Sequence, residues 1–289
     1  MEKVFLNGSL MPASEAKIDI DDSSFLYGIG LFETMRAAGG RVFRLDDHLQ
    51  RLMMSAQTLA IVCSYSTAMI RHGVEQVLQA NGLSDARIRL TLTSGPLRTE
   101  EEPRSTLLIT ATEFVPYSKD YFEKGVRVVI TDYRQNPKDP FVGHKTTCFG
   151  PRLAALRAAH EKLAAEALWF TTENRLAEGC LSNVFLVCGG RLLTPPLSTP
   201  VLGGIARKTV LELARQEKIP FEERPLDIND LLSAEEVFLT NVIMTILPVI
   251  AVEGHTVAEG KPGPITKRLM EKYEEQLKGR KTDETIAGN

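Results

Sequence analysis

Within the first 115 residues, hydrophobic and polar residues alternate over two segments. Residues 31–37 and 86–93 alternate with the period of two that is typical of half-buried strands. The tight turn Asn7-Gly8 lies inside residues 4–10 and predicts a hairpin. Further strands are predicted at residues 41–45 and 105–112, and helices after Asp46-Asp47 and at residues 66–81. This mixture predicts a small α+β domain over residues 1–115.

The pattern changes after residues 114–119, where Pro116 stiffens a predicted connection between two domains. Short apolar strands then dominate, at residues 126–131, 167–171, 184–187, 191–194 and 237–239. Helices are predicted at residues 153–165, 205–216 and 264–279. A second, larger domain over residues 120–289 is therefore expected.

Composition and charge narrow the classes of function. The 289 residues carry a net charge of −3, which argues against a nucleic-acid or anionic-membrane partner. No apolar run approaches the length of a membrane-spanning helix, and the first residues lack an apolar signal core. The four cysteines show neither a CxxC pair nor a zinc spacing, which predicts reduced thiols and a cytoplasmic protein.

Lys145 lies in the segment Gly143-His144-Lys145-Thr146-Thr147, between a proline-punctuated approach and a predicted helix. Such a lysine is often a solvated loop residue. A lysine whose pKa is lowered by burial can instead form a Schiff base with a carbonyl compound.

Arg51 and His48 share one face of their predicted helix. Arg51 could form a surface salt bridge, or its guanidinium could bind a phosphate. His48 could orient Arg51, but we favour a packed core histidine. Glu178 follows Ala177 in a predicted turn, where it is either solvated or buried against a pyridine nitrogen.

Glycines precede the helix predicted at residue 205, in Leu202-Gly203-Gly204-Ile205-Ala206-Arg207. They form either a tight turn or a phosphate site of backbone N–H groups. A weaker candidate of the same kind is the turn Thr240-Asn241-Val242-Ile243. A Schiff-base lysine, a carboxylate for a pyridinium nitrogen and a phosphate site are three needs of one cofactor, pyridoxal phosphate.

These motifs together resemble the class IV aminotransferases, which are fold type IV of the pyridoxal phosphate enzymes. That family includes branched-chain and D-amino acid aminotransferases and 4-amino-4-deoxychorismate lyase. The resemblance covers nearly the whole chain and rests on ordered motifs: Phe32-Glu33-Thr34-Met35-Arg36, His48-Leu49-Gln50-Arg51-Leu52, His144-Lys145-Thr146, Glu178-Gly179-Cys180-Leu181-Ser182-Asn183, Gly204-Ile205-Ala206-Arg207 and Glu236-Val237-Phe238-Leu239-Thr240-Asn241.

The resemblance implies a role for each matching residue. Lys145 would carry the cofactor, Glu178 would pair with the pyridine nitrogen, and Leu202 would press on the ring. The phosphate would be bound by Arg51, by the backbone of Gly204, Ile205 and Ala206, and by the turn at Val242. Phe32 and Ile243 would lie beside the substrate. The resemblance also implies that residues 120–289 form a larger pseudo-barrel domain that carries Lys145, and that the protein is a homodimer.

Several residues depart from the family pattern. Cys148-Phe149 replaces a common Asn-Tyr, so no phenol there can bond the cofactor's ring oxygen, and Ala206 replaces a common threonine. Thr34 narrows the pocket relative to branched-chain enzymes, and Asn241 with Met244 looks more like the lyases. The leading prediction is amino-group transfer between an amino acid or amine and a 2-keto acid. The alternative is release of pyruvate from aminodeoxychorismate, and a third is cofactor holding without turnover.

The substrate carboxylate needs positive charge or aligned N–H groups. Four arginines are candidates: Arg36, Arg87, Arg89 and Arg98. Arg36 and Arg89 could instead pair with Glu33 and do structural work. Arg98 follows Gly95-Pro96 in a loop, and D-amino acid aminotransferases carry an arginine in a similar loop. The backbone turn at Val242-Ile243 is the main rival to Arg98.

Overall fold

The computed structural model describes residues 2–97 and 104–279. Contacts divide the chain into two compact units that interleave along the sequence. The first comprises Met1–Pro116, Gln135–Ala155 and Pro200–Ile205, and the second comprises Tyr117–Arg134, Leu156–Thr199 and Ala206–Asn289. Lys145 therefore belongs to the first unit. The domain boundaries expected from the sequence, residues 1–115 and 120–289, stay a prediction.

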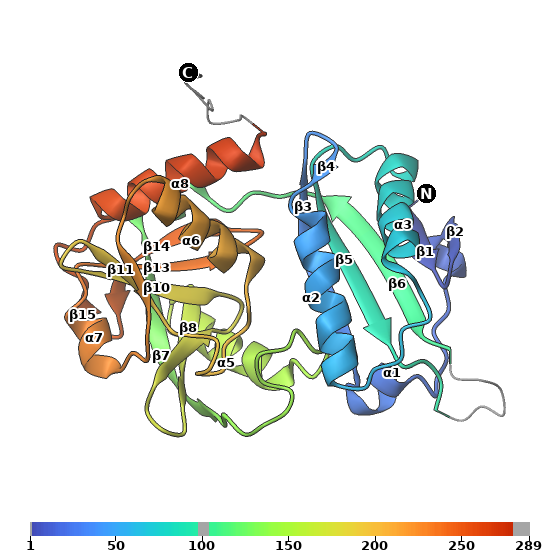
Figure 1. The fold of residues 1–289 in the computed structure, drawn as a ribbon, viewed down its shortest axis with the longest axis horizontal. Coiled ribbons are helices and arrows are strands. Elements are labelled where there is room, and N and C mark those ends of the chain that lie inside the picture. Colours follow the sequence, from blue (N-terminus) through green and yellow to red (C-terminus); the bar gives the residue numbers. More distant parts are fainter. Residues whose placement is uncertain (1, 98–103, 280–289) are drawn as a thin grey trace, which may run out of the picture. The chain divides into compact units, whose positions relative to one another are not determined.

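The first unit is built on a six-stranded antiparallel sheet (Figure 1). Its spatial order is β2-β1-β6-β5-β3-β4. The strands are β1 (Lys3–Leu6), β2 (Ser9–Pro12), β3 (Gly30–Ala38), β4 (Arg41–Val42), β5 (Ala86–Thr93) and β6 (Thr106–Glu113). The short helices η1 (Ala13–Glu15) and α1 (Ser23–Tyr27) precede β3. The predicted hairpin and the predicted central strands are confirmed.

Helices α2 (Leu45–Thr58) and α3 (Thr67–Ala80) supply the apolar side chains that bury one face of this sheet. Along α2, Leu45, Leu49, Leu52 and Ala56 recur at helical spacing and are buried. Residues 31, 33 and 35 of β3 point to this face, because side chains alternate along a strand. Leu31 and Met35 pack in the core on this face. The Glu33 side chain points to the same face, so its carboxylate lies among apolar neighbours.

The second unit contains a nine-stranded mixed sheet. Its main path is β12-β11-β10-β13-β14-β7-β8-β9, and β15 pairs with β14. The strands are β7 (Val126–Gln135), β8 (Glu166–Thr171), β9 (Leu176–Gly179), β10 (Asn183–Cys188), β11 (Arg191–Thr194), β12 (Phe221–Glu223), β13 (Glu236–Asn241), β14 (Thr245–Val252) and β15 (His255–Thr256). The remaining helices are α4 (Lys119–Lys124), α5 (Gly150–Glu161), α6 (Ile205–Gln216), α7 (Ile228–Leu232) and α8 (Pro264–Leu277), of which α5 is divided between the two units after Ala155. The predicted α+β class is confirmed.

Three local predictions were wrong. Glu178 lies in strand β9 and not in a turn, because residues 176 and 179 pair with β8. The strand expected at residues 41–45 ends at Val42, and α2 already begins at Leu45. Asp46 and Asp47 consequently lie in the first turn of α2, where acidic side chains interact favourably with the positive end of the helix dipole.

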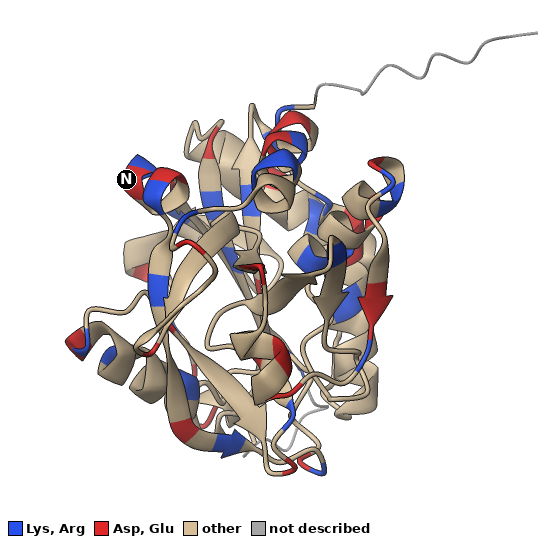
Figure 2. Cartoon of the chain, turned by 90° about the vertical axis from the view of Figure 1, so that its left-hand side faces the viewer, with Lys and Arg blue, Asp and Glu red and all other residues tan. Residues whose placement is uncertain are grey.

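Charged residues of both signs are interspersed along the elements (Figure 2). Among the described residues, no helix is long and apolar enough to cross a membrane.

Candidate active site

The segment around Lys145 is held along strand β3 in the first unit. The Lys145 carbonyl accepts the Phe32 N–H at 2.8 Å, and the Thr147 N–H donates to the Gly30 carbonyl at 2.9 Å. Leu31 and Thr146 form an antiparallel bridge between these two bonds. The half-buried Lys145 side chain places Nζ 4.5 Å from the centroid of the Phe32 ring. The backbone of this lysine is therefore fixed.

Thr147 locks the far end of this segment. Its hydroxyl donates to the Gly28 carbonyl at 2.7 Å and accepts from the Ser24 hydroxyl at 2.9 Å. A Cβ at Gly30 would approach Thr147 Oγ1 to 3.0 Å and the Leu92 carbonyl oxygen to 3.1 Å. Glycine at position 30 therefore permits the close approach of the lysine segment to β3.

Glu33, His48 and Arg51 form a buried cluster between β3 and α2. Arg51 donates from Nε to Glu33 Oε1 at 2.8 Å and from Nη2 to Oε2 at 2.5 Å. His48 Nδ1 lies 2.7 Å from Glu33 Oε2. Burial alone would raise the pKa of Glu33, but the charge of Arg51 and the bond with His48 lower it to about 2. Glu33 is therefore a carboxylate at neutral pH.

His48 is fully buried and neutral. Burial lowers the pKa of His48 below 6.5, Glu33 opposes this shift, and the charges of Arg51 and Lys145 add to it. Because an ionised carboxylate can only accept, the single ring proton lies on Nδ1. His48 Nε2 is then an acceptor, and it has no hydrogen-bond partner among the described residues.

Arg51 also reaches the glycine turn that precedes α6. Its Nη1 donates to the Gly203 carbonyl at 3.0 Å, and the Gly204 N–H donates to the Leu202 carbonyl at 2.8 Å. Leu202 and Gly204 are partly exposed, and Ile205 is buried at the start of α6. The structure thus joins two predicted phosphate-binding groups of the first unit, the Arg51 guanidinium and this turn.

The candidate arginines for a substrate carboxylate have different environments. Arg36 pairs with Asp85 at 3.3 Å and stacks on Phe114, so it does structural work. The Arg89 guanidinium carbon lies 3.4 Å from the centroid of the Phe32 ring. Burial and then the charge of Arg87 lower the pKa of Arg89 to about 10, against the influence of Glu33. Among the described residues, Arg89 forms no ion pair with a carboxylate. Arg98 lies outside the described residues.

The alternative in which Glu33 pairs with Arg36 or Arg89 is not favoured by the geometry of the strand. Residues 32, 34 and 36 point to the sheet face opposite Glu33, and Arg89 pairs in register with Thr34. The two arginines therefore lie on the other face of the sheet from the Glu33 carboxylate. Its partners are Arg51 and His48 of α2. The alternation of β3 with apolar residues at 31 and 35 was the signal that could have placed Glu33 against α2.

The other predicted residues belong to the second unit. Glu178 is buried in β9 with 3% exposure, and Ala206 is buried in the first turn of α6. Val242 is buried and Ile243 half-buried, in the turn between β13 and β14. In that turn the Ile243 and Met244 N–H groups both donate to Asn241 Oδ1 at 2.9 Å. The Ile243 N–H, a predicted rival for the substrate carboxylate, is therefore already engaged.

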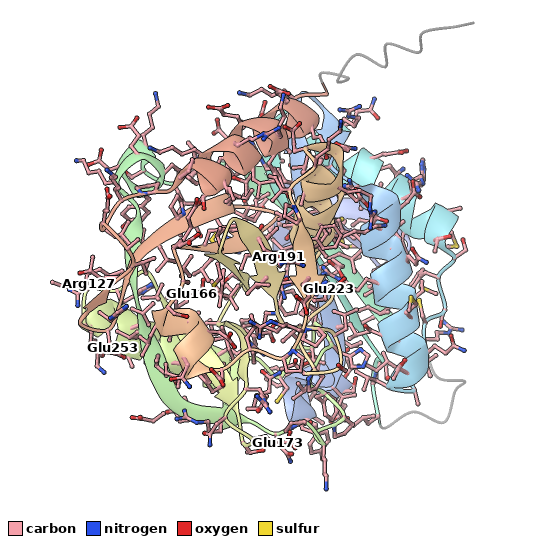
Figure 3. The ribbon with its side chains drawn as sticks, turned by 60° about the vertical axis from the view of Figure 1, so that its left-hand side comes forward. Arg127, Glu166, Glu173, Arg191, Glu223 and Glu253 are labelled. Atoms are coloured by element: carbon pink, nitrogen blue, oxygen red, sulfur yellow. The ribbon has the colours of Figure 1, made fainter. Side chains whose placement is uncertain are left out.

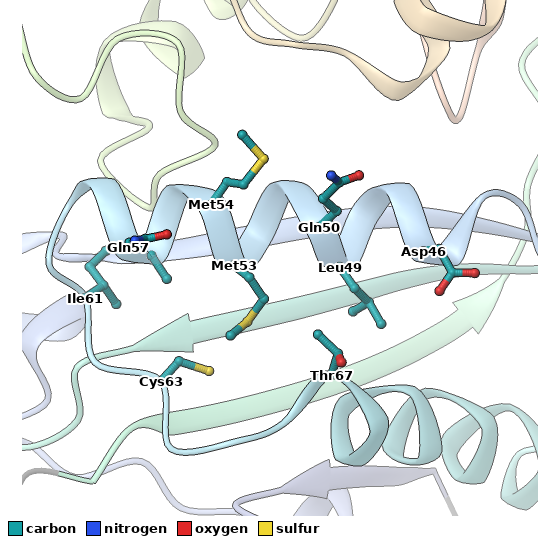
Figure 4. A pocket seen from close by; sticks show the side chains of 10 residues that line it. Asp46, Leu49, Gln50, Met53, Met54, Gln57, Ile61, Cys63 and Thr67 are labelled. Carbon is teal, nitrogen blue, oxygen red and sulfur yellow. The ribbon is translucent and has the colours of Figure 1, made fainter.

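A pocket of about 580 Å³ lies elsewhere, along α2 and the loop before α3 (Figure 4). None of the predicted site residues lines it. Its lining residues are Asp46, Leu49, Gln50, Met53, Met54, Ala56, Gln57, Ile61, Cys63 and Thr67.

Comparison of sequences identifies the family. The sequence model of class IV amino-transferases matches residues 30–252. A Methanocaldococcus jannaschii protein named as a candidate branched-chain-amino-acid aminotransferase is 32% identical, over 94% of this chain and 96% of its own. The D-alanine aminotransferase of Bacillus licheniformis is 31% identical, over 93% and 94%. The chain therefore belongs to the class IV aminotransferases and is a transaminase of that family.

Solved structures agree with this assignment. The branched-chain amino acid aminotransferase of Escherichia coli matches with a TM-score of 0.92 and 26% identity, over 99% of this chain and 97% of its own. The 4-amino-4-deoxychorismate lyase of Pseudomonas aeruginosa matches with a TM-score of 0.85 and 28% identity, over 95% and 99%. A further branched-chain amino acid aminotransferase, with a TM-score of 0.91 and 25% identity over 97% and 95%, was solved with pyridoxamine 5'-phosphate. The predicted fold type IV is confirmed.

Proposed function

We propose that this transaminase uses pyridoxal 5'-phosphate held by Lys145, and that it moves an amino group between an amino acid or amine and a 2-keto acid. The observation that carries the proposal lies on two consecutive residues of β3. Phe32 fixes the Lys145 segment through a 2.8 Å backbone bond, and Glu33 holds the fork of Arg51. One strand thereby fixes the backbone of the lysine and the guanidinium of Arg51.

The residues present fit the chemistry of this cofactor. The remaining N–H groups of Arg51, with the backbone of Ile205 and Ala206 at the start of α6, suit a phosphate dianion. The Gly204 N–H, a further predicted donor, would have to leave the Leu202 carbonyl. Val242, in the second unit, is a further predicted phosphate ligand. Glu178 is a buried carboxylate of the kind that pairs with a pyridinium nitrogen. Leu202 would pack on the ring.

Pyridoxal phosphate, when bound, supplies an electron sink that acidifies the α-carbon of an amino acid. Lys145 Nζ would take that proton and return it, and a single amine on one face can do both transfers. Glu33 keeps its charge because the pKa is about 2, so the Arg51 fork stays oriented throughout the physiological range. His48 stays neutral because burial lowers its pKa.

Arg89 is our candidate for the substrate carboxylate. It lies on the ring of Phe32, which also contacts Lys145 Nζ. Its guanidinium remains charged at neutral pH with a pKa of about 10. Its Nε donates to the Thr91 hydroxyl at 3.5 Å, and its two Nη groups could meet a carboxylate while the guanidinium stays on the aromatic face. Arg98 stays a prediction. Branched-chain amino acids and D-alanine, which relatives are named for, are the donors to test first.

We also propose a cytoplasmic homodimer. Ile20, Phe25 and Tyr27 of the first unit are 77%, 73% and 67% exposed, and a second copy of the chain would bury such an apolar group. All four cysteines are free thiols, as is usual in reducing compartments.

The test compares the wild type with Lys145→Ala after reconstitution with pyridoxal phosphate. Lys138→Ala is the matched control, since Lys138 is an exposed lysine in the segment that precedes Lys145. The wild type and the control should show an absorption band that borohydride bleaches, and Lys145→Ala should lack it. A reducible band in Lys145→Ala would refute the role of Lys145.

Assays of amino-group transfer and of pyruvate release from aminodeoxychorismate then decide the reaction. The lyase remains the second candidate because a solved lyase matches nearly the whole chain. Transfer from an amino acid to a keto acid without pyruvate release is the expected result. Pyruvate release as the faster reaction would favour the lyase. If neither activity is detected, the protein holds the cofactor without turnover.

A further inference from the structure

The turn between β13 and β14 is closed by the side chain of Asn241. Asn241 pairs with Thr245, and three residues, Val242, Ile243 and Met244, connect the two strands. Thr245 has a φ of +59°, the left-handed conformation that often ends a three-residue hairpin loop. Asn241 Oδ1 accepts both the Ile243 and the Met244 N–H at 2.9 Å. This local capping fixes the direction of the intervening backbone.

The same side chain bonds to a second turn that is distant in sequence. Asn241 Nδ2 donates to the Leu181 carbonyl at 3.2 Å, across a separation of 60 residues. Leu181 lies in the connection from β9, which carries Glu178, to β10. Strands β10 and β13 pair with Asn183 opposite Thr240, which brings the two turns to the same end of the sheet.

The turn at residues 179–182 is also held from its other side. The buried carboxylate of Glu166, labelled in Figure 3, accepts the Leu181 N–H and the Ser182 hydroxyl, the latter at 2.7 Å. A Cβ at Gly179 would come within 2.5 Å of Glu166 Oε1, so the carboxylate occupies the space that this glycine leaves. Leu181 is therefore fixed by Glu166 through its N–H and by Asn241 through its carbonyl.

The geometry points to Asn241 as a positioning residue, which ties the turn at Val242 to the turn that follows Glu178 and withholds the Ile243 N–H from an incoming anion. This inference rests on the proposed cofactor roles of Glu178 and Val242. The Asn241 amide would then set the position of Glu178, the partner of the pyridine nitrogen, relative to Val242, a donor to the phosphate. It also removes the Ile243 N–H from the candidates for the substrate carboxylate, which leaves Arg89 and the predicted Arg98.

Asparagine at position 241 is specific for this task because its amide offers an acceptor and a donor on one group. Aspartate would keep the two bonds from Ile243 and Met244 but could not donate to Leu181. Serine could accept a local N–H, but its shorter side chain would not reach Leu181. Both substitutions therefore remove the bond to the Leu181 carbonyl, while their side-chain oxygen can still accept an N–H within the turn.

The experiment compares Asn241→Ser and Asn241→Asp with the wild type, each as the full chain. Asn174→Asp is the control, because Asn174 is an exposed turn residue of the β8–β9 hairpin with a φ of +58°. For each apo protein, the dissociation constant of pyridoxal phosphate is measured by absorption titration, and the urea midpoint by circular dichroism. KM and kcat are then measured with an amino acid donor.

We expect Asn241→Ser to raise the dissociation constant of pyridoxal phosphate about tenfold, the effect of losing one hydrogen bond to a well-placed group. Asn241→Asp should raise it further, because a carboxylate then repels the phosphate. In both variants KM should rise more than kcat falls, and the urea midpoint should stay close to that of the wild type. Asn174→Asp should match the wild type in every measurement.

The inference is overturned if both Asn241 variants keep the dissociation constant and KM within about twofold of the wild type, the range of a neutral surface change. A lower urea midpoint with unchanged cofactor affinity would likewise leave Asn241 as a purely structural cap. Failure of the wild type itself to take up pyridoxal phosphate would overturn the proposed function, and this inference with it. Normal uptake by the wild type with unchanged variants would overturn the inference alone.

Discussion

The two units hold their candidate residues in place in different ways. In the first unit, side chains bond to side chains: Glu33 contacts Arg51 and His48 within one buried ionised cluster. In the second unit, side chains bond largely to backbone: Asn241 contacts Leu181, Ile243 and Met244 through their main-chain groups.

This difference decides which changes each region tolerates. The first cluster needs three particular side chains, and its strength depends on charge and therefore on pH. The second network needs Asn241, but any residue except proline supplies the backbone groups that it uses. The first region should consequently fail through loss of charge, and the second through loss of geometry.

The largest effect is expected from Glu33→Gln, which breaks the ionised cluster. It would leave the Arg51 guanidinium partly buried without its carboxylate, and breaking a buried ion pair typically costs about 3–5 kcal/mol. Urea unfolding of the apo protein measures this loss of stability. Glu15→Gln, at an exposed position of the same unit, is the control. Equal stability of Glu33→Gln and the wild type would show that the cluster contributes nothing to the fold.

Acid should weaken the first unit in two stages. In the folded protein the pKa of His48 lies below 6.5, so His48 takes up a proton at a higher pH in the unfolded chain than in the folded one. The free energy of unfolding therefore falls as the pH drops below 6.5. The pKa of Glu33 is lowered from 4.5 to about 2, so its stabilisation is present above pH 4.5 and is lost as the pH falls toward 2.

His48→Gln tests the first stage, with the exposed His72→Gln as its control. The free energy of unfolding, measured at pH values on either side of 6.5, should depend less on pH in His48→Gln than in the wild type. His72→Gln should keep the wild-type slope. Identical slopes in all three proteins would contradict the assignment of a neutral, buried His48.

Arg89→Gln should have an intermediate effect that appears in substrate binding. Removing the guanidinium should raise KM for a 2-keto acid about tenfold, as expected for one charge-assisted hydrogen bond. The absorption band of the bound cofactor should not change. Arg87→Gln, an exposed neighbour on the same strand face, is the matched control and should have the smaller effect. An unchanged KM in Arg89→Gln would return the carboxylate to Arg98 or to the backbone.

The smallest effect is expected from Leu181→Ala in the second unit. Leu181 is 37% exposed and joins the network through its N–H and carbonyl, which alanine retains. Cofactor affinity should stay within about twofold, as is usual for a surface substitution. The titration used for the Asn241 variants measures it. A tenfold loss would mean that the leucine side chain itself contacts the cofactor, contrary to the role assigned to its backbone.

Much of the fold could be predicted from the sequence, because it rests on local periodicity. The alternation over β3 and β5 was predicted from residue spacing alone. The family was likewise identified from ordered motifs around Lys145, Arg51 and Glu178, and the family comparison confirms it. The roles of these residues stay predictions, since they depend on a bound cofactor.

The sequence by itself determined which residue types are present and which side of each element they occupy. Only the tertiary structure decided that Glu33 pairs with Arg51 and His48 instead of Arg36 or Arg89, that Glu178 lies in a strand, and that the Ile243 N–H is taken by Asn241. The physical reason is that a hydrogen bond requires its two atoms to lie within about 3.5 Å. Residue spacing specifies the face of a strand or helix, whereas strand register and packing between elements decide which of several chemically equivalent partners comes that close.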